Sequence, residues 1–184
     1  MKKEIEVKIL NIDLKGFRAT LRARGARRIQ KPTLFTEIYW KSPLPNPAFS
    51  SFRIRHEGAR SFLTVKLSKT QHAKFLLREE YEITIGDFEM ARQIVSLLGF
   101  SVFCERQKIR ESYTLKGSRI EIDQYPLMKP YAEIESSTIV SAQSIMRKLG
   151  YSFDDTVNMT ATEVIKGAGR NPYKLMFDVR KSRR

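Results

Sequence analysis

Alternating apolar and polar residues recur in short runs along most of the chain. In the first run, residues 3–10, Ile5, Val7 and Ile9 are separated by charged residues. A period of two is typical of a half-buried β-strand. The same period predicts strands at residues 28–31 with 34–41, 51–57, 61–68, 76–84, 102–115, 119–125 and 131–136. We therefore expect about eight strands.

Four other segments have the period of a helix. The first begins after Asp13, a suitable N-cap, and ends at Gly25. The second covers residues 87–98, with Asp87 as its cap and an apolar face of Met90, Ile94, Leu97 and Leu98. The third covers residues 138–149, the fourth covers residues 155–166, and residues beyond 167 have no clear period. These elements predict an α+β protein with one core.

Length and cysteine content limit the class of protein. The chain has 184 residues and one cysteine, Cys104, so an internal disulfide or a cysteine-based zinc site is excluded. A single thiol fits a reducing compartment, and we expect a cytoplasmic protein. No apolar run has the length of a membrane span, about 20 residues, and the first residues lack the apolar core of a signal peptide.

The formal net charge of +14 indicates an anionic ligand. Nucleic acid, an anionic membrane and a phosphorylated small molecule all satisfy that charge. A nucleic-acid-binding protein would carry its basic residues on an outer face, whereas many basic residues here alternate into the same strand faces as carboxylates. We therefore expect a small phosphorylated ligand, with nucleic acid bound only weakly through the surface.

The charged strand faces allow two arrangements. In one, an open sheet packs its apolar face on helices and exposes its charged face to water. In the other, the sheet closes into an antiparallel barrel whose charged face lines the interior, and about eight strands leave room for one small ligand. Carboxylates two residues apart on a strand favour the barrel, because like charges this close repel one another unless a cation lies between them.

The acidic and the basic residues of these faces together suit a phosphorylated ligand with its divalent cation. Paired carboxylates are ligands for a hard divalent ion, Mg²⁺ or Mn²⁺, and arginine and lysine bind phosphate oxygens. The paired carboxylates are Glu4, Glu6, Glu121, Asp123, Glu133 and Glu135, and the opposite charge is supplied by Lys8, Arg53, Arg55, Lys66, Lys108 and Arg110.

Several of these motifs, in this order, resemble the CYTH superfamily of triphosphate tunnel metalloenzymes. The first is the Glu-x-Glu-x-Lys signature at residues 4–8. The others are Phe-Arg-Ile-Arg at 52–55, Thr-Val-Lys at 64–66, Arg-Glu-Glu-Tyr-Glu at 78–82, Lys-Ile-Arg at 108–110, Glu-Ile-Asp at 121–123 and Glu-Ile-Glu at 133–135. The resemblance extends from residue 4 to about 137, and past 150 with the Leu-Gly-Tyr stretch.

The resemblance implies a closed eight-stranded antiparallel barrel, the triphosphate tunnel, with helices packed outside. It implies a single tunnel domain at residues 1–167, which leaves 168–184 as a basic C-terminal tail. By position, Glu4, Glu6, Glu133 and Glu135 would be metal ligands supported by Glu82, Glu121 and Asp123, and Lys8, Arg53, Arg55, Lys66, Lys108 and Arg110 would bind the triphosphate. Arg78 and Glu80 would either join them or form an ion pair in the wall.

Two reactions and one binding role follow from the resemblance. A hydrolase would direct water at the γ-phosphoryl group of inorganic triphosphate, thiamine triphosphate or a nucleoside triphosphate, and a cyclase would convert ATP to cyclic AMP and pyrophosphate. The family's cyclases carry a His-Phe element, absent here, and a Gln-x-Asp-x-Tyr-Phe stretch, which residues 35–40 match only in the aromatics. We therefore favour the triphosphatase, as a monomer or homodimer. Binding without turnover stays open, as does whether Tyr39 and Trp40 stack on substrate or pack in the core.

Overall fold

A computed structural model describes residues 2–44, 49–67, 70–71 and 75–178, without the side chains of 2–4, 49, 70–71 and 76–78. The predictions for the side chains of Glu4 and Arg78, and for residues 68, 72–74 and 179–184, lie outside this part of the chain. Within it there are eleven strands and four helices, which confirms the α+β class.

The strands correspond closely to the alternating runs of the sequence. They are β1 (Lys2–Ile9), β2 (Arg27–Lys41), β3 (Phe49–Glu57), β4 (Arg60–Leu67), β5 (Thr70–Gln71), β6 (Leu76–Ile85), β7 (Ser101–Leu115), β8 (Ser118–Gln124), β9 (Tyr131–Ser136), β10 (Thr156–Val157) and β11 (Lys174–Leu175). The eight long strands pair only antiparallel with one another, as predicted. The two-residue strand β11 is a departure, because it pairs parallel to β7.

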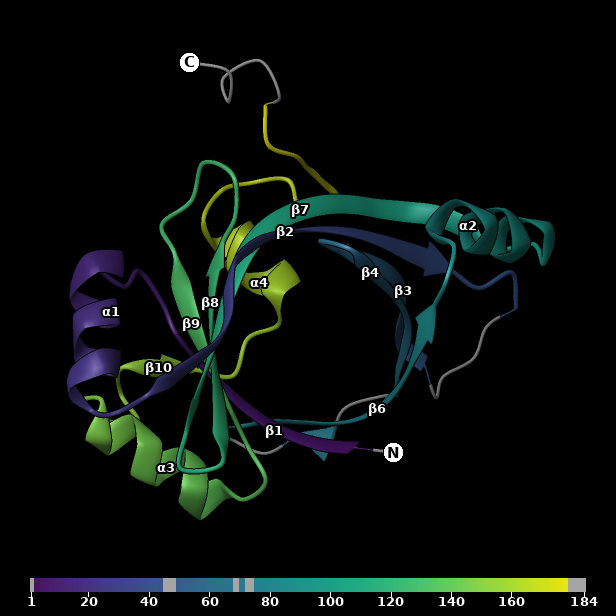
Figure 1. Ribbon diagram of the computed structural model, residues 1–184. Helices are drawn as coiled ribbons and strands as arrows, with labels where there is room; N and C mark the ends of the chain where they lie inside the picture. Colours follow the sequence, from purple (N-terminus) through teal and green to yellow (C-terminus); the bar gives the residue numbers. More distant parts are fainter. Residues whose placement is uncertain (1, 45–48, 68–69, 72–74, 179–184) are drawn as a thin grey trace.

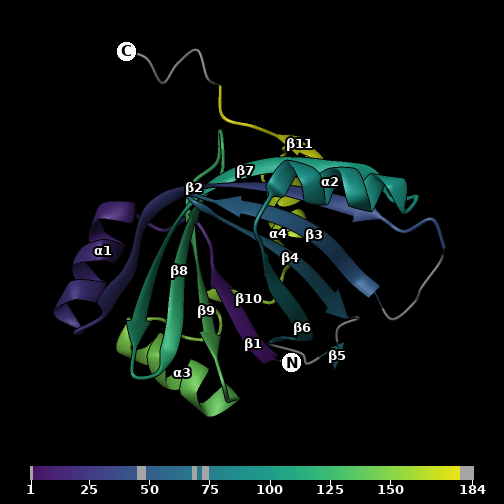
Figure 2. The same cartoon turned by 45° about the vertical axis from the view of Figure 1, so that its right-hand side comes forward.

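The first strand has long neighbours on both sides. Glu6 pairs with Glu135 of β9 on one side and with Leu76 of β6 on the other. The remaining order is β9-β8-β7-β2-β3-β4-β6, so a path from neighbour to neighbour passes through eight strands and returns to β1. Figure 1 shows this circuit of strands, and Figure 2 shows the same strands turned by 45°.

Three helices cover the outer, apolar face of the strands (Figure 1). They are α1 (Leu14–Ala23), α2 (Phe88–Leu97) and α3 (Ile139–Lys148). The largest core packs Phe17 and Leu21 of α1 and Ile145 of α3 against strand residues such as Ile120 and Ile134, all at most 4% exposed. Full burial of one such side chain contributes about 1.5–3 kcal/mol. The inward positions of the same strands are therefore left to the charged residues.

The N-caps of α1 and α2 were predicted correctly, but the buried face of α2 was not. The Asp13 carboxylate accepts from the Gly16 amide at 2.8 Å and the Asp87 carboxylate from the Met90 amide at 2.9 Å, which confirms both N-caps. The predicted core face of α2 was wrong, because Met90 and Leu97 are 52% and 87% exposed. Instead, α2 packs through Val95, with Phe88 and Ala91, on the core of β2 and β3.

The C-terminal part of the chain packs against one end of the sheet. The predicted fourth helix is shorter than expected: α4 covers Ala161–Gly167 and begins with a capping box between Thr160 and Glu163. Leu175, in the stretch assigned to the basic tail, is 7% exposed and packs with Val164 and Ile165 of α4. In the described residues, none of the helices has the length and apolar character needed to cross a membrane.

Candidate active site

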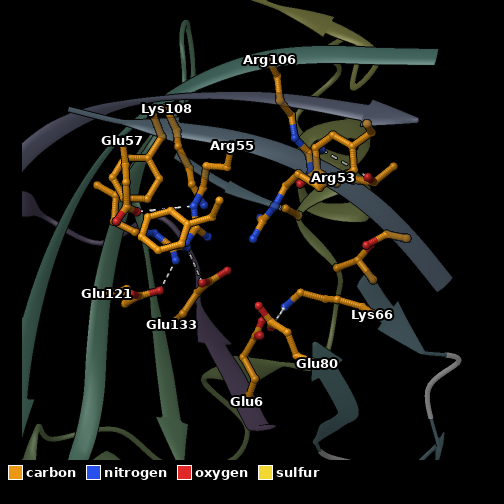
Figure 3. Close-up of a pocket in the computed structure, with 18 of the residues that line it drawn as sticks. Glu6, Arg53, Arg55, Glu57, Lys66, Glu80, Arg106, Lys108, Glu121 and Glu133 are labelled. Atoms are coloured by element: carbon orange, nitrogen blue, oxygen red, sulfur yellow. Dashed lines mark hydrogen bonds and ion pairs between the residues drawn. The ribbon is translucent and has the colours of Figure 1, made fainter. Parts of the chain in front are cut away.

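The inward faces of the strands line a cavity of about 760 Å³. Nine basic and seven acidic side chains contribute to its wall, and Figure 3 shows many of them pointing into a common space. The basic residues are Lys8, Arg53, Arg55, Arg60, Lys66, Arg106, Lys108, Arg110 and Arg119, and the acidic ones are Glu6, Glu57, Glu80, Glu82, Glu121, Glu133 and Glu135. All six predicted triphosphate ligands are therefore brought together, with five of the seven predicted metal ligands.

Arg110 of β7 is the centre of a cluster of three carboxylates. Its guanidinium lies 2.5 Å from Asp123 and 2.6 Å from Glu133, and it also contacts Glu121. Asp123 is fully buried behind the wall, where the Lys108 ammonium lies 2.9 Å away, so it does not line the cavity as predicted. Burial alone would lower the pKa of Arg110, but the three carboxylates outweigh it and raise the pKa well above the ordinary value.

The carboxylates of β1 and β9 lie side by side because of the strand register. Glu6 is directly opposite Glu135, and Lys8 is directly opposite Glu133. The buried Lys8 ammonium contacts Glu6 and lies 3.2 Å from Glu133. Burial would raise the pKa of Glu133, but Lys8 and Arg110 lower it by more, so this carboxylate stays charged.

The opposite wall, built by β3, β4 and β6, carries a second set of ion pairs. The Lys66 ammonium lies 2.7 Å from Glu80, which places Glu80 in the cavity wall (Figure 3). The Arg55 guanidinium is 3.3 Å from Glu82 and 3.4 Å from Glu57. Burial lowers the pKa of Arg55, and the charge of Arg53 lowers it further. The positive charge of Arg55 is thus incompletely balanced and would be stabilised by an anion.

Sequence reasoning missed Glu37 of β2, a buried carboxylate that holds three cations of the wall. It accepts from Arg53 at 2.9 Å and from Arg106 at 3.2 Å, and the Lys108 ammonium is 3.6 Å away. Burial would raise the pKa of Glu37, but the charges of Lys108, Arg53 and Arg106 hold it well below the ordinary value. The signal available in the sequence was that Glu37 shares its strand face with Tyr39.

Arg106 of β7 also lines the cavity, although it was not among the predicted ligands. It donates to the Tyr39 hydroxyl at 2.5 Å and to the Thr162 hydroxyl at 3.3 Å, and its guanidinium lies 4.4 Å from the centre of the Tyr39 ring. Arg106 therefore links β7, β2 and α4 at one end of the cavity. Trp40, the neighbour of Tyr39, is 5% exposed and belongs to the core under α2.

The depressed pKa of Glu37 predicts a specific pH dependence of stability. The unfolded chain binds a proton at this carboxylate near pH 4.5, the ordinary value, and the folded protein binds it only at lower pH. Its stabilising contribution is therefore complete above pH 4.5 and is lost as the pH falls towards the folded pKa. Glu37→Gln should lower the free energy of unfolding by about 3 kcal/mol at pH 6 and by much less at pH 3, measured by urea denaturation.

The matched control for this experiment is Glu89→Gln. Glu89 pairs with Arg92 on the surface of α2, with 67% of its side chain exposed. Exposed pairs of this kind contribute about 0–1 kcal/mol, so this variant should follow the wild type at every pH. A gap between wild type and Glu37→Gln that stays constant from pH 6 to pH 3 would contradict the assignment.

The oxygen donors in the wall can be compared with the requirements of a divalent cation. Among the described side chains, no three acidic, histidine or cysteine residues gather as a ready-made metal site. The reason is visible in the ion pairs, since Lys8 and Arg110 contact the carboxylates of Glu6, Glu121 and Glu133. The acidic oxygens on neighbouring strands would suit Mg²⁺ or Mn²⁺ once Lys8 and Arg110 no longer contact them.

Comparisons with known proteins agree on the fold. A relative from Methanocaldococcus jannaschii named "Putative adenylate cyclase" is 29% identical over 123 residues, which are 62% of this chain and 70% of the relative. A conserved hypothetical protein from Pyrococcus furiosus superposes with a TM-score of 0.73 at 24% identity, covering 88% of this chain and 99% of that one.

A more distant structure and a family model complete the comparison. The structure, from Hippeastrum, is described as a putative adenylyl cyclase with a dominant triphosphatase activity; it superposes with a TM-score of 0.64 at 16% identity, covering 93% of this chain and 97% of that one. The CYTH domain model matches residues 2–157. This chain therefore belongs to the CYTH domain family.

Proposed function

We propose that this protein hydrolyses a triphosphate inside the charged cavity. The observation that carries the proposal is the convergence of nine cations and seven carboxylates on one cavity of about 760 Å³. A cluster of arginines and lysines matches the oxygens of a phosphate chain. The circuit of paired strands would enclose the substrate as a tunnel, within a single domain at residues 1–167 of a cytoplasmic protein.

The cations of the wall would bind and orient the phosphate chain. Arg53 and Arg55 approach from β3, Lys66 from β4, Lys108 and Arg110 from β7, and Lys8 from β1. Spread over several strands, these charges would hold the chain in one orientation and stabilise negative charge on the transferred phosphoryl group. Arg55, whose pKa is lowered by burial and by Arg53, would be stabilised by the anion.

Glu6, Glu133 and Glu135 would hold the divalent cation on β1 and β9, with Glu82, Glu121 and the buried Asp123 in support. When bound, Mg²⁺ or Mn²⁺ would supply positive charge that polarises the phosphoryl oxygens. These residues fit the ion because their register places acidic oxygens directly opposite one another. Carboxylates so placed repel each other unless a cation lies between them.

The ion pairs of the wall suggest how its charge becomes available to substrate. Lys8 and Arg110 are held by the same carboxylates that would bind the divalent cation. Once those carboxylates are neutralised, the two side chains lose their partners and their charge favours the triphosphate. Binding of the cation and of the triphosphate should therefore strengthen each other.

Residues 35–40 favour hydrolysis over cyclisation. The family's cyclases have Gln and Asp where this chain has Phe35 and Glu37. Phe35 is buried and has the charges of Arg55 and Lys108 near its ring, at 5.4 and 5.8 Å from its centre, and Glu37 is committed to its three cations. Adenylate cyclase activity is the second candidate, favoured by the name of the Methanocaldococcus relative.

A product assay tests the proposal. Purified protein is incubated with Mg²⁺ or Mn²⁺ and either ATP or inorganic triphosphate. Orthophosphate without cyclic AMP is the expected result. Cyclic AMP with pyrophosphate from ATP would establish the cyclase instead, and no product with either metal would leave a triphosphate-binding protein without turnover.

A further inference from the structure

Three aromatic side chains form a rim at one end of the cavity. Tyr39, Phe103 and Tyr173 all line it. The ring centres of Tyr39 and Phe103 are 6.3 Å apart, and those of Phe103 and Tyr173 are 6.4 Å apart. Phe103 and Tyr173 are each 46% exposed, so a large part of both rings is open to a ligand. We call these three residues the aromatic rim.

Phe103 reaches the cavity because of an irregularity in its strand. Tyr39 pairs with Cys104 and Trp40 pairs with Val102, so Phe103 is an extra residue in β7. An extra residue of this kind, a β-bulge, redirects a side chain and is common at barrel rims and active sites. Here it lets Phe103 and Cys104, which are adjacent in sequence, both line the cavity.

Tyr173 is fixed in place by the chain that follows α4. The Tyr173 carbonyl accepts from the Glu105 amide at 2.9 Å, and the Pro172 carbonyl accepts from the Cys104 thiol at 3.2 Å. Leu175 then anchors β11 in the core below α4. This segment lies beyond the residues 2–157 that match the family model. The aromatic rim is thus partly built by sequence outside the family match.

The size and charge of this end of the cavity limit the group that fits it. A volume of about 760 Å³ is within the range of about 300–1,000 Å³ found for pockets that hold drug-sized ligands, so it exceeds the needs of a bare triphosphate. The Lys166 ammonium lies 5.6 Å from the centre of the Tyr173 ring and the Arg106 guanidinium 4.4 Å from that of Tyr39. These charges would repel a cationic ring, whereas an uncharged planar ring can stack on the exposed aromatic surface.

We propose that Phe103 and Tyr173 form a stacking subsite that selects triphosphates carrying an uncharged planar ring, of which nucleoside triphosphates are the natural class. The inference rests on the proposed function in one respect: the phosphate chain of the ligand occupies the cations of the wall. The ring then extends past Arg106 to the aromatic rim. Inorganic triphosphate would bind the same cations without this contact.

Calorimetric titration with ligands that resist hydrolysis tests the subsite. The ligands are the β,γ-methylene forms of ATP and thiamine triphosphate, and inorganic triphosphate with methylene groups in both bridges, each with Mg²⁺. The wild type should bind the ATP form about tenfold more tightly than the inorganic form, and the thiamine form, whose ring is cationic, should gain less. Tyr173→Ala and Phe103→Ala should each weaken the ATP form about five- to tenfold, in line with stacking on aromatic side chains, and leave the inorganic form within about twofold.

Tyr81→Ala is the matched control, because Tyr81 is 48% exposed on β6 and does not line the cavity. Its affinities should equal those of the wild type. Equal binding of the ATP and inorganic forms by the wild type, an equal gain for the thiamine form, or an equal loss of both ligands in Tyr173→Ala would overturn the inference.

The inference and the proposed function can fail separately. Tight binding of the inorganic form with no added affinity for the ATP form overturns the stacking subsite alone. Ring-dependent binding of the ATP form, combined with a product assay that yields no orthophosphate, upholds the subsite and overturns the hydrolase. No binding of any form overturns both.

Discussion

Glu6→Gln is expected to reduce metal-dependent triphosphate turnover by at least about 10³-fold and to leave the fold intact. The loss follows from the proposed role of Glu6 as a ligand, since a bound cation contributes several kcal/mol to phosphoryl transfer and each 1.36 kcal/mol is a factor of ten in rate. The fold should survive because Lys8 keeps its second partner, Glu133, at 3.2 Å. The loss of turnover is measured by initial rates of phosphate release, and the stability of the fold by the melting temperature.

The control variant is Glu105→Gln. Glu105 lies on the same sheet, but its side chain is 41% exposed and does not line the cavity. Its turnover should stay within about twofold of the wild type. If Glu6→Gln kept a tenth or more of wild-type turnover at saturating Mg²⁺, the assignment of Glu6 as a metal ligand would be wrong.

Arg110→Met should lower the free energy of unfolding by about 3–5 kcal/mol. The guanidinium is shared by Glu121, Asp123 and Glu133, and removing one partner of a buried ion pair leaves charge without compensation. Because 1 kcal/mol corresponds to about 2–4 °C in a protein of this size, the melting temperature should fall by roughly 10 °C. Added Mg²⁺ should raise it more in the variant than in the wild type, since the three carboxylates then lack their arginine.

Arg92→Met serves as the comparison, because Arg92 pairs with Glu89 on the surface of α2 at 3.2 Å. It should change the free energy of unfolding by less than about 1 kcal/mol and should not alter the response to Mg²⁺. A loss in Arg110→Met no larger than in Arg92→Met would show that the cluster is not stabilising. An equal effect of Mg²⁺ on Arg110→Met and wild type would argue against these carboxylates as cation ligands.

The sequence predicted the long strands and the inward charged residues because both depend on a period of two. Arg53 and Arg55, or Lys108 and Arg110, must share a face in any regular strand, whatever the partner strands are. The period of two does not predict which basic side chain forms an ion pair with which carboxylate. Glu37 shows this limit. It is one carboxylate on β2, and the cations that it binds lie on β3 and β7. Its role can therefore be recognised only when the pairing of the three strands is known.

Elements without a usable period were predicted poorly. Helix α2 has apolar residues on two sides, and the sequence does not reveal which side packs, so exposed Met90 and Leu97 were expected in the core. Phe103 enters the cavity only through a bulge, which breaks the period itself. Strand β11 has two residues, too few for any period, and the segment around Tyr173 was therefore read as part of a tail.

The pairing of β1 on both sides also governs when this protein can fold during its synthesis. Strand β1 ends at Ile9, whereas its partners β6 and β9 begin at Leu76 and Tyr131. At about 5–20 residues per second, the ribosome completes β9 of the order of ten seconds after β1. Until then β1 can pair only with β6, and the Glu135 and Glu133 partners of Glu6 and Lys8 are still missing. Contacts between residues so far apart in the sequence are slow to form. Strand β1 thus keeps one unpaired edge until β9 is made, and agents that shield this edge in the meantime should improve the yield of folded protein.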